Sequence, residues 1–332
     1  MMPEIMTVTG PVAARNLGLT LMHEHLLINQ MREQRRTGLV ADHSLLLDEI
    51  GAFAGAGGGT IVDLTSGELA DGAARDPLGL YAKGPSRIGD TVHTRGTAHA
   101  RELRSLAVES GVNVVAGTGH YRDPYLDRRW FDRHSVDEIA ELLIADITLG
   151  FPGTDVRAGI IGEIGADKWY VSAAEERSFR AAARAHLRTG VPVSTHAARW
   201  PVGLAQLEIL RSEGVDPAHV IIGHCDSVPI PEYHLDLARA GAWVQFDGIR
   251  AAAGRDLRNR VEWVLALCRE GFHSRVLLSH DVCTLEDFRA NGGCGLTLVP
   301  TLFLDELVKA GLDPEEAREL LRGNPARALA GG

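Results

Sequence analysis

The chain has 332 residues, of which 45% are hydrophobic and 23% are charged, and its formal net charge is −10. This length suits one large α/β barrel, and the hydrophobic fraction is ordinary for a globular protein with a substantial core. The acidic balance argues against a nucleic-acid partner, because phosphate binding requires a basic surface.

Features that would direct the chain out of the cytoplasm are not visible in the sequence. The first 16 residues lack a basic segment followed by an apolar one, and no apolar run approaches the roughly 20 residues of a membrane span. The cysteines lack paired short spacings, as expected for free thiols in a reducing compartment. They are Cys225, Cys268, Cys283 and Cys294. We therefore expect a cytoplasmic protein without a membrane partner.

Eight short β-rich segments follow one another along the chain. Most of them are apolar throughout, which is typical of strands that are covered on both faces. They are residues 19–23, 60–65, 112–118, 158–164, 191–196, 219–224, 242–247 and 275–281.

Helical patterns alternate with these strands. Ser135 and Glu138 have the spacing of a capping box, Gly190 should end one helix, and Asp313 with Pro314 should begin another. The expected helices are residues 44–56, 139–150, 173–189, 202–212, 232–240, 257–270, 299–310 and 314–321. Eight strands alternating with helices predict a TIM (β/α)8 barrel, with residues 1–332 forming a single domain.

One stretch is anomalous for such a barrel. Residues 67–98 are rich in Gly, Asp, Arg and Thr and are too long for an ordinary connection between a strand and a helix. We expect this extended loop to lie over the barrel mouth as a lid or an oligomer contact. A doubly wound sheet would also alternate, but it usually carries a glycine fingerprint where this chain has His23-Glu24-His25.

Potential metal ligands lie at the C-terminal ends of the predicted strands. His23 and His25 are two residues apart on an extended segment, so both side chains point the same way. The other candidates are Glu163, His196, His224 and Asp281. In a barrel these strand ends converge on one face, and four imidazoles with two carboxylates are too many for a single tetrahedral zinc. The set suits two divalent ions with a shared carboxylate between them.

The remaining candidates for this chemistry are less informative. His280 adjoins Asp281 on a strand, so alternation should turn it away from the metals. Cys225 and Cys283 also adjoin ligand positions, but the six ligands are complete without them. Most other histidines lie on predicted helices or loops and are expected at the surface. They are His43, His93, His134, His186, His219, His234 and His273.

Several segments, in this order and at these spacings, resemble the phosphotriesterase family of the amidohydrolase superfamily. They are residues 21–26, 59–65, 111–121, 158–165, 189–196, 222–226, 278–281 and 324–327. The resemblance covers nearly the whole chain. It implies a binuclear site, usually occupied by zinc, at the C-terminal face of the barrel.

The resemblance also implies a division of the ligands. His23, His25 and Asp281 would hold the more buried ion, and His196 and His224 the more exposed one. Many members bridge the two ions with a carboxylated lysine. Here Glu163 stands in register, as in the branch typified by phosphotriesterase homology proteins. We expect Zn²⁺, although imidazole–carboxylate sites also accept Mn²⁺, Co²⁺ or Fe²⁺.

The expected reaction is hydrolysis. Two such cations can form a bridging hydroxide near neutral pH, which would attack a carbonyl or phosphoryl centre, with Asp281 carrying the proton to the leaving group. Organophosphate-hydrolysing members have a relay histidine after the aspartate of strand seven, whereas Gly248 follows Asp247 here. We therefore favour a carboxylic ester or lactone as substrate. An N-acyl amine, or a phosphoester or organophosphate, is the alternative.

Substrate contacts are expected from residues that follow strands three, four and seven. They are His120, Tyr121, Trp169 and Arg250, each of which is also compatible with packing or with solvation. A non-catalytic barrel that binds a small ligand would have a broken ligand set, and this set is complete. The expected partner is a small-molecule substrate, and a homodimer is left open.

Overall fold

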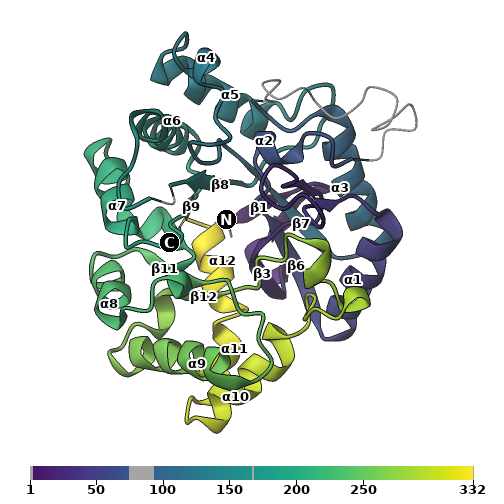
Figure 1. Ribbon diagram of the computed structural model, residues 1–332, viewed down its shortest axis with the longest axis vertical. Helices are drawn as coiled ribbons and strands as arrows, with labels where there is room; N and C mark the ends of the chain where they lie inside the picture. The colour runs from purple at the N-terminus through teal and green to yellow at the C-terminus, as the bar shows by residue number, and fades with distance from the viewer. Residues whose placement is uncertain (1–2, 75–92, 167, 332) are drawn as a thin grey trace.

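Eight parallel strands form the central sheet of the protein (Figure 1). The computed structural model describes residues 3–74, 93–166 and 168–331. In order around the sheet the strands are β12 (Val276–Leu278), β11 (Trp243–Phe246), β10 (Val220–Gly223), β9 (Val193–His196), β8 (Ile160–Gly165), β7 (Asn113–Thr118), β6 (Gly58–Asp63) and β3 (Leu19–Glu24).

The first and last strands of this sheet meet and close it into a barrel. The backbone N–H of His23 donates to Ser279 Oγ at 2.9 Å, and the N–H of Asp281 donates to the His23 carbonyl at 3.1 Å. The N–H of His25 donates to the Val282 carbonyl at 3.2 Å. The predicted TIM (β/α)8 barrel is therefore confirmed.

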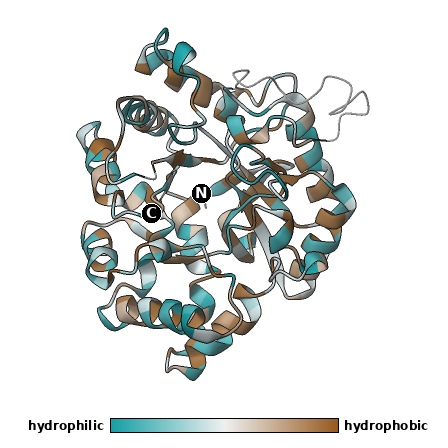
Figure 2. Cartoon of the chain, in the orientation of Figure 1, coloured by the Kyte–Doolittle hydropathy of each residue, from teal (hydrophilic) through white to brown (hydrophobic). Residues whose placement is uncertain are grey.

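Helices surround the barrel, and apolar residues concentrate on its strands (Figures 1 and 2). The longer helices are α1 (His43–Gly55), α3 (Thr97–Ser110), α5 (Val136–Thr148), α6 (Ala173–Thr189), α7 (Gly203–Ser212), α8 (Pro231–Arg239) and α9 (Gly254–Arg269). The shorter ones are α2 (Gly67–Ala70), α4 (Arg128–Phe131), α10 (Leu304–Lys309), α11 (Pro314–Glu319) and α12 (Gly323–Leu329). No helix in the described part of the chain is both long and apolar enough to cross a bilayer.

The barrel interior is filled at its N-terminal end. Met22, Val62, Ile160 and Trp243 belong to one buried cluster with Leu329 of α12, the helix at the centre of Figure 1. This packing leaves the opposite, C-terminal end of the strands as the place where polar side chains can gather, as in other barrels of this type.

Several local predictions are confirmed. Ser135 and Glu138 form the capping box that begins α5, and Gly190 ends α6 with a φ of 75°. Asp313 caps α11, with Pro314 in its first turn. The helix expected over residues 299–310 begins instead as a π-helix, Val299–Phe303, which continues into α10.

Other elements were missed. They are the hairpin of β1 (Glu4–Thr7) and β2 (Gly10–Ala13), the short pair β4 (Ile28–Asn29) and β5 (Leu39–Val40), and helices α3, α4 and α12. The expected loop over residues 67–98 lies mostly outside the described residues. Its described ends form α2 and lead into α3. Its role as a lid or contact, and the single-domain organisation, stay predictions.

Candidate metal centre

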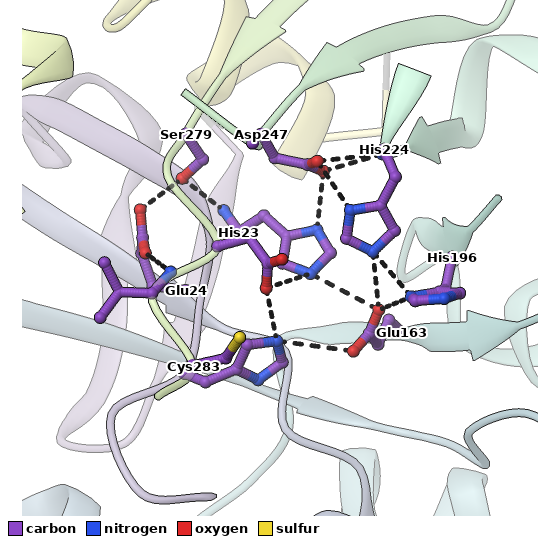
Figure 3. Close-up of polar contacts among 12 residues, drawn as sticks. His23, Glu24, Glu163, His196, His224, Asp247, Ser279 and Cys283 are labelled. Atoms are coloured by element: carbon purple, nitrogen blue, oxygen red, sulfur yellow. Dashed lines mark hydrogen bonds and ion pairs between the residues drawn. The ribbon is translucent and has the colours of Figure 1, made fainter. Parts of the chain in front are cut away.

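The six predicted ligands come together at the C-terminal ends of the barrel strands. Figure 3 labels His23, Glu163, His196 and His224 among them. His23 lies within β3, Glu163 within β8, and His196 is the last residue of β9. His25, His224 and Asp281 follow β3, β10 and β12.

Two of these ligands have an unusual backbone. His224 and Asp281 have φ angles of 56° and 55°, in the left-handed region that few residues other than glycine adopt. Hydrogen bonds hold this conformation, because the His224 N–H donates to the Asp247 carboxylate and the Asp281 N–H to the His23 carbonyl. Such residues concentrate at functional sites, where the surrounding structure holds the strain.

One half of the cluster consists of His23, His25 and Asp281, whose ligand atoms all lie within 4.8 Å of one another. His25 Nε2 is 3.3 Å from Asp281 Oδ1 and 3.5 Å from Glu163 Oε1. His23 Nε2 is 3.5 Å from Glu163 Oε2. These atoms converge on the space beside Glu163.

The other half consists of His196 and His224. His196 Nδ1 lies 2.8 Å from Glu163 Oε2 and 2.7 Å from His224 Nε2. Glu163 therefore lies between the two halves, as the bridging position requires. The nearby Lys168 points elsewhere, because its Nζ contacts Asp123 Oδ2 at 3.2 Å.

A glycine allows Glu163 to take this place. Gly162 has a φ of 141°, and a Cβ there would lie 2.4 Å from the Ser194 carbonyl oxygen. Only a residue without a side chain lets β8 approach β9 this closely.

A buried carboxylate behind the ligands was missed as a site residue. Asp247 Oδ1 lies 2.8 Å from His224 Nδ1, and Asp247 Oδ2 lies 3.0 Å from His23 Nδ1. A carboxylate at Nδ1 fixes the tautomer that leaves Nε2 free to bind a metal. Asp247 thus orients one histidine from each half of the cluster (Figure 3). Its position at the end of the seventh predicted strand was a visible signal.

Glu24 is the second buried carboxylate that was missed. It points away from the cluster and accepts hydrogen bonds from Ser279 Oγ, His280 Nδ1 and the backbone N–H groups of His280 and Val282. It therefore fixes the segment that carries Asp281. The expectation that His280 turns away from the ligands agrees with these contacts.

The charge of the cluster and an unpaired buried nitrogen are both compatible with a bound cation. His23 Nε2 is buried and has no hydrogen-bond partner among the described residues. Burial alone would raise the pKa of the Glu163 carboxyl, but His196, His224 and His23 together hold that pKa well below its usual range. Burial would lower the pKa of His23, yet the Asp247 and Glu163 carboxylates together raise it to about 10, because this buried negative charge attracts positive charge to the site. Deprotonated carboxylates beside imidazole nitrogens are the ligands that Zn²⁺ and similar divalent transition-metal ions prefer.

Arg250 contacts the protein around Asp281. Its Nη2 lies 2.6 Å from Asp281 Oδ2 and also contacts the Asp281 carbonyl, while its Nε donates to the His280 carbonyl at 2.8 Å. Its Nη1 donates to Asp287 Oδ1 at 3.2 Å. Burial would raise the pKa of the Asp281 carboxyl, but Arg250 holds it below its ordinary value. These contacts favour a positioning role for Arg250, and a contact with substrate stays a prediction.

The Asp226 carboxylate fills the space that a relay histidine at position 248 would need. Asp226 Oδ2 accepts hydrogen bonds from the Gly248 N–H at 2.9 Å and from Arg260 Nε at 2.7 Å. A Cβ on Gly248 would lie 2.7 Å from that oxygen. A relay histidine could not replace Gly248 without displacing the Asp226 carboxylate.

The other predicted substrate contacts differ in position. Tyr121 lines the cavity beside the ligands, with its hydroxyl 3.4 Å from His196 Nδ1. His120 is buried, and its Nδ1 contacts Glu68 Oε1 at 2.8 Å. Trp169 is 74% exposed and lies outside the residues that line this cavity.

Two histidines expected at the surface are buried, so that expectation was wrong for them. His186 Nδ1 lies 2.8 Å from the Val191 carbonyl, and His234 Nε2 lies 2.8 Å from the Cys225 carbonyl. The four cysteines are free, and Cys225 Sγ contacts the Ile222 carbonyl.

Comparison with known proteins agrees with this geometry. The model of the phosphotriesterase family matches residues 3–329. The phosphotriesterase homology protein of Escherichia coli is 35% identical over 248 residues, which cover 75% of this chain and 85% of that protein. An N-acetyltaurine hydrolase of Tetraodon nigroviridis is 26% identical over 375 residues, covering 98% of this chain and 97% of the other.

A solved structure extends the comparison to the fold. The lactonase Lmo2620 from Listeria monocytogenes superposes with a TM-score of 0.82 at 26% identity, and the match covers 98% of each chain. The family match spans nearly the whole sequence, including every predicted ligand. The chain therefore belongs to the phosphotriesterase family.

Proposed function

We propose that the protein is a metal-dependent hydrolase that cleaves a carboxylic ester or lactone. The observation that carries this proposal is the convergence of six ligands, with the Glu163 carboxylate between the two halves of the cluster, 3.5 Å from His25 Nε2 and 2.8 Å from His196 Nδ1. Two divalent cations bound there, most simply Zn²⁺, would supply a hydroxide near neutral pH and would polarise the scissile oxygen.

The protein residues around this chemistry have separate tasks. Asp281 Oδ1 faces His25, and Asp281 Oδ2 is held by Arg250, so the carboxylate is oriented before substrate binds. A carboxylate so oriented can accept a proton from the attacking water and pass it to the leaving group. Asp247 and Glu24 keep the ligands in place and take no proton from substrate.

The choice of ester or lactone has two supports. Asp226 occupies the space that the relay histidine of organophosphate hydrolases would need at position 248. One of the similar solved structures is that of a lactonase. Hydrolysis of an N-acyl amine is the second candidate, because N-acetyltaurine hydrolases align with 98% of this chain. The same ligand cluster would serve either acyl group, since both reactions pass through attack on a carbonyl carbon.

A hydrolysis screen tests the proposal. Metal-loaded protein is incubated with lactones, carboxylic esters, N-acyl amines and organophosphates, and proton release is followed. We expect turnover of lactones or esters, and Asp281→Asn should reduce that rate to near background. Turnover of N-acyl amines alone would replace the first candidate with the second. A wild-type rate in Asp281→Asn would remove this residue from proton transfer.

A further inference from the structure

A small cavity opens beside the metal ligands. Its volume is about 260 Å³, and Tyr121, Arg122, His196, His224 and Asp281 are among the residues that line it. Cavities for drug-sized ligands are usually larger, roughly 300–1,000 Å³. The cavity therefore fits a small acyl compound that reaches from the ligands to Arg122.

Arg122 brings a buried positive charge to this cavity. Its side chain is only 6% exposed, and its guanidinium carbon lies 5.1 Å from the ring centre of Tyr121 and 5.4 Å from that of Tyr125. A buried guanidinium needs an anion as partner, because the cost of removing it from water is otherwise large. Its position directly after Tyr121, whose hydroxyl approaches His196, sets the charge next to the ligand cluster.

Glu33 provides the anion in this structure. Both carboxylate oxygens accept hydrogen bonds from Arg122 Nη2, at 2.6 and 2.5 Å. The Glu33 side chain is 36% exposed and belongs to the turn between β4 and β5, which also lines the cavity. A partly solvated carboxylate on a turn can leave the guanidinium with little change in the barrel.

The other arginines of the cavity are less suited to exchange partners. Arg260 Nε donates to Asp226, whose side chain is 2% exposed and also accepts from the Gly248 N–H. Arg199 is exposed to solvent, where an ion pair contributes little. Arg260 also contacts the exposed Asp256, but the buried Asp226 anchors its guanidinium. Arg122 is the more buried of the two, and the carboxylate that it contacts, Glu33, is partly exposed.

We propose that Arg122 binds an anionic group of the substrate, a carboxylate or sulfonate, and that Glu33 is the resident carboxylate which this group displaces. The inference rests on the proposed hydrolase function and names its substrate class, a small acyl compound with a negative charge. The planar guanidinium matches either anion, because two parallel N–H donors fit two oxygens.

Matched substrate pairs test this inference. Monoethyl succinate and ethyl succinamate are esters that differ in one charge, and N-acetyl-β-alanine and N-acetyl-β-alaninamide are the corresponding amides. A hydrogen-bonded charge pair predicts a kcat/KM about tenfold to a hundredfold higher for the anionic member. Arg122→Gln should raise KM for the anionic member and so remove most of this preference, with a much smaller effect on the neutral member. Arg128→Gln is the matched control, because Arg128 pairs with Asp123 outside the cavity lining.

A second variant separates substrate binding from folding. Glu33→Gln removes the competing carboxylate from a partly exposed position, so KM for the anionic member should fall severalfold. Equal kcat/KM for both members in the wild type would overturn the inference and leave the hydrolase standing. An equal loss on both members in Arg122→Gln would assign this residue a structural role.

If neither substrate pair is hydrolysed, that result counts against the proposed function. The anion subsite is then tested by measuring ligand binding directly. Propane-1-sulfonate and propane-1-sulfonamide are titrated calorimetrically into metal-loaded protein. The anion subsite predicts binding of the sulfonate by the wild type and by Arg128→Gln, with at least tenfold weaker binding by Arg122→Gln. Equal affinity in all three proteins would overturn it.

Discussion

Replacing Asp247 with asparagine removes one charge behind the metal ligands while the shape stays the same. The carboxylate contacts Nδ1 of His224 at 2.8 Å and Nδ1 of His23 at 3.0 Å, and it accepts from Gln245 Nε2 at 2.9 Å. An asparagine retains one acceptor oxygen and turns an NH₂ donor toward the second imidazole. One histidine then loses the partner that keeps its Nε2 available for a metal.

The magnitude follows from these contacts. A hydrogen bond to a charged group contributes about 1.5–3 kcal/mol to stability. Loss of a partner behind a metal ligand typically weakens metal affinity about 10–100-fold, which corresponds to about 1.4–2.7 kcal/mol. Because Asp247 contacts a ligand from each half of the cluster, we expect both metal ions to be bound more weakly.

Competition with a chromophoric chelator measures this loss. Metal-free Asp247→Asn and wild-type protein are titrated with Zn²⁺ in the presence of the chelator, and circular dichroism verifies the fold. Asp137→Asn is the matched control, because Asp137 is 77% exposed and pairs only with Arg184 among the described residues. Wild-type zinc affinity in Asp247→Asn would refute the assignment of Asp247 as the residue that orients both histidines.

Two further substitutions test other contacts of the structure. Arg250→Gln removes the cation that holds Asp281 Oδ2, so kcat/KM for the screened substrate should fall about 10–100-fold. Arg250→Lys should restore only part of this loss, because lysine lacks the planar guanidinium. An unchanged kcat/KM in Arg250→Gln would contradict the positioning role. Asp146 is buried, and burial raises its pKa from 3.8 to about 6 despite the hydroxyls of Thr118 and Thr94. Between these values the folded state binds the extra proton, so stability should fall as pH rises from about 4 to 6, by about 3 kcal/mol. Asp146→Asn should flatten this part of the pH dependence of Tm, and an unaltered slope would contradict the assignment.

The sequence predicted the fold and the ligands because both leave a local pattern. A His-x-His pair and four more donors each ended an apolar run, and parallel strands bring such ends to one face. The helix α3 was missed although Ala100, Leu103, Leu106 and Ala107 have helical spacing, because the stretch before it was interpreted as one long loop.

Contacts between distant residues could not be predicted in this way. Glu24 lies between two candidate ligands, and only the structure reveals its hydrogen bonds to residues 279–282. In the sequence, Asp247 was informative only through Gly248, the residue that follows it. Its contacts with His23 and His224 depend on closure of the barrel. The burial of His234 depends likewise on carbonyl acceptors from a neighbouring turn.

The central claim is that Glu163 joins two metal ions within one set of six ligands. Metal content per chain, measured by inductively coupled plasma mass spectrometry after reconstitution with Zn²⁺, tests it most directly. We expect two zinc ions in the wild type and fewer than two in Glu163→Ala, with no carbon dioxide required for assembly. A wild-type protein that binds fewer than two ions, or a Glu163→Ala protein that retains two, would contradict it.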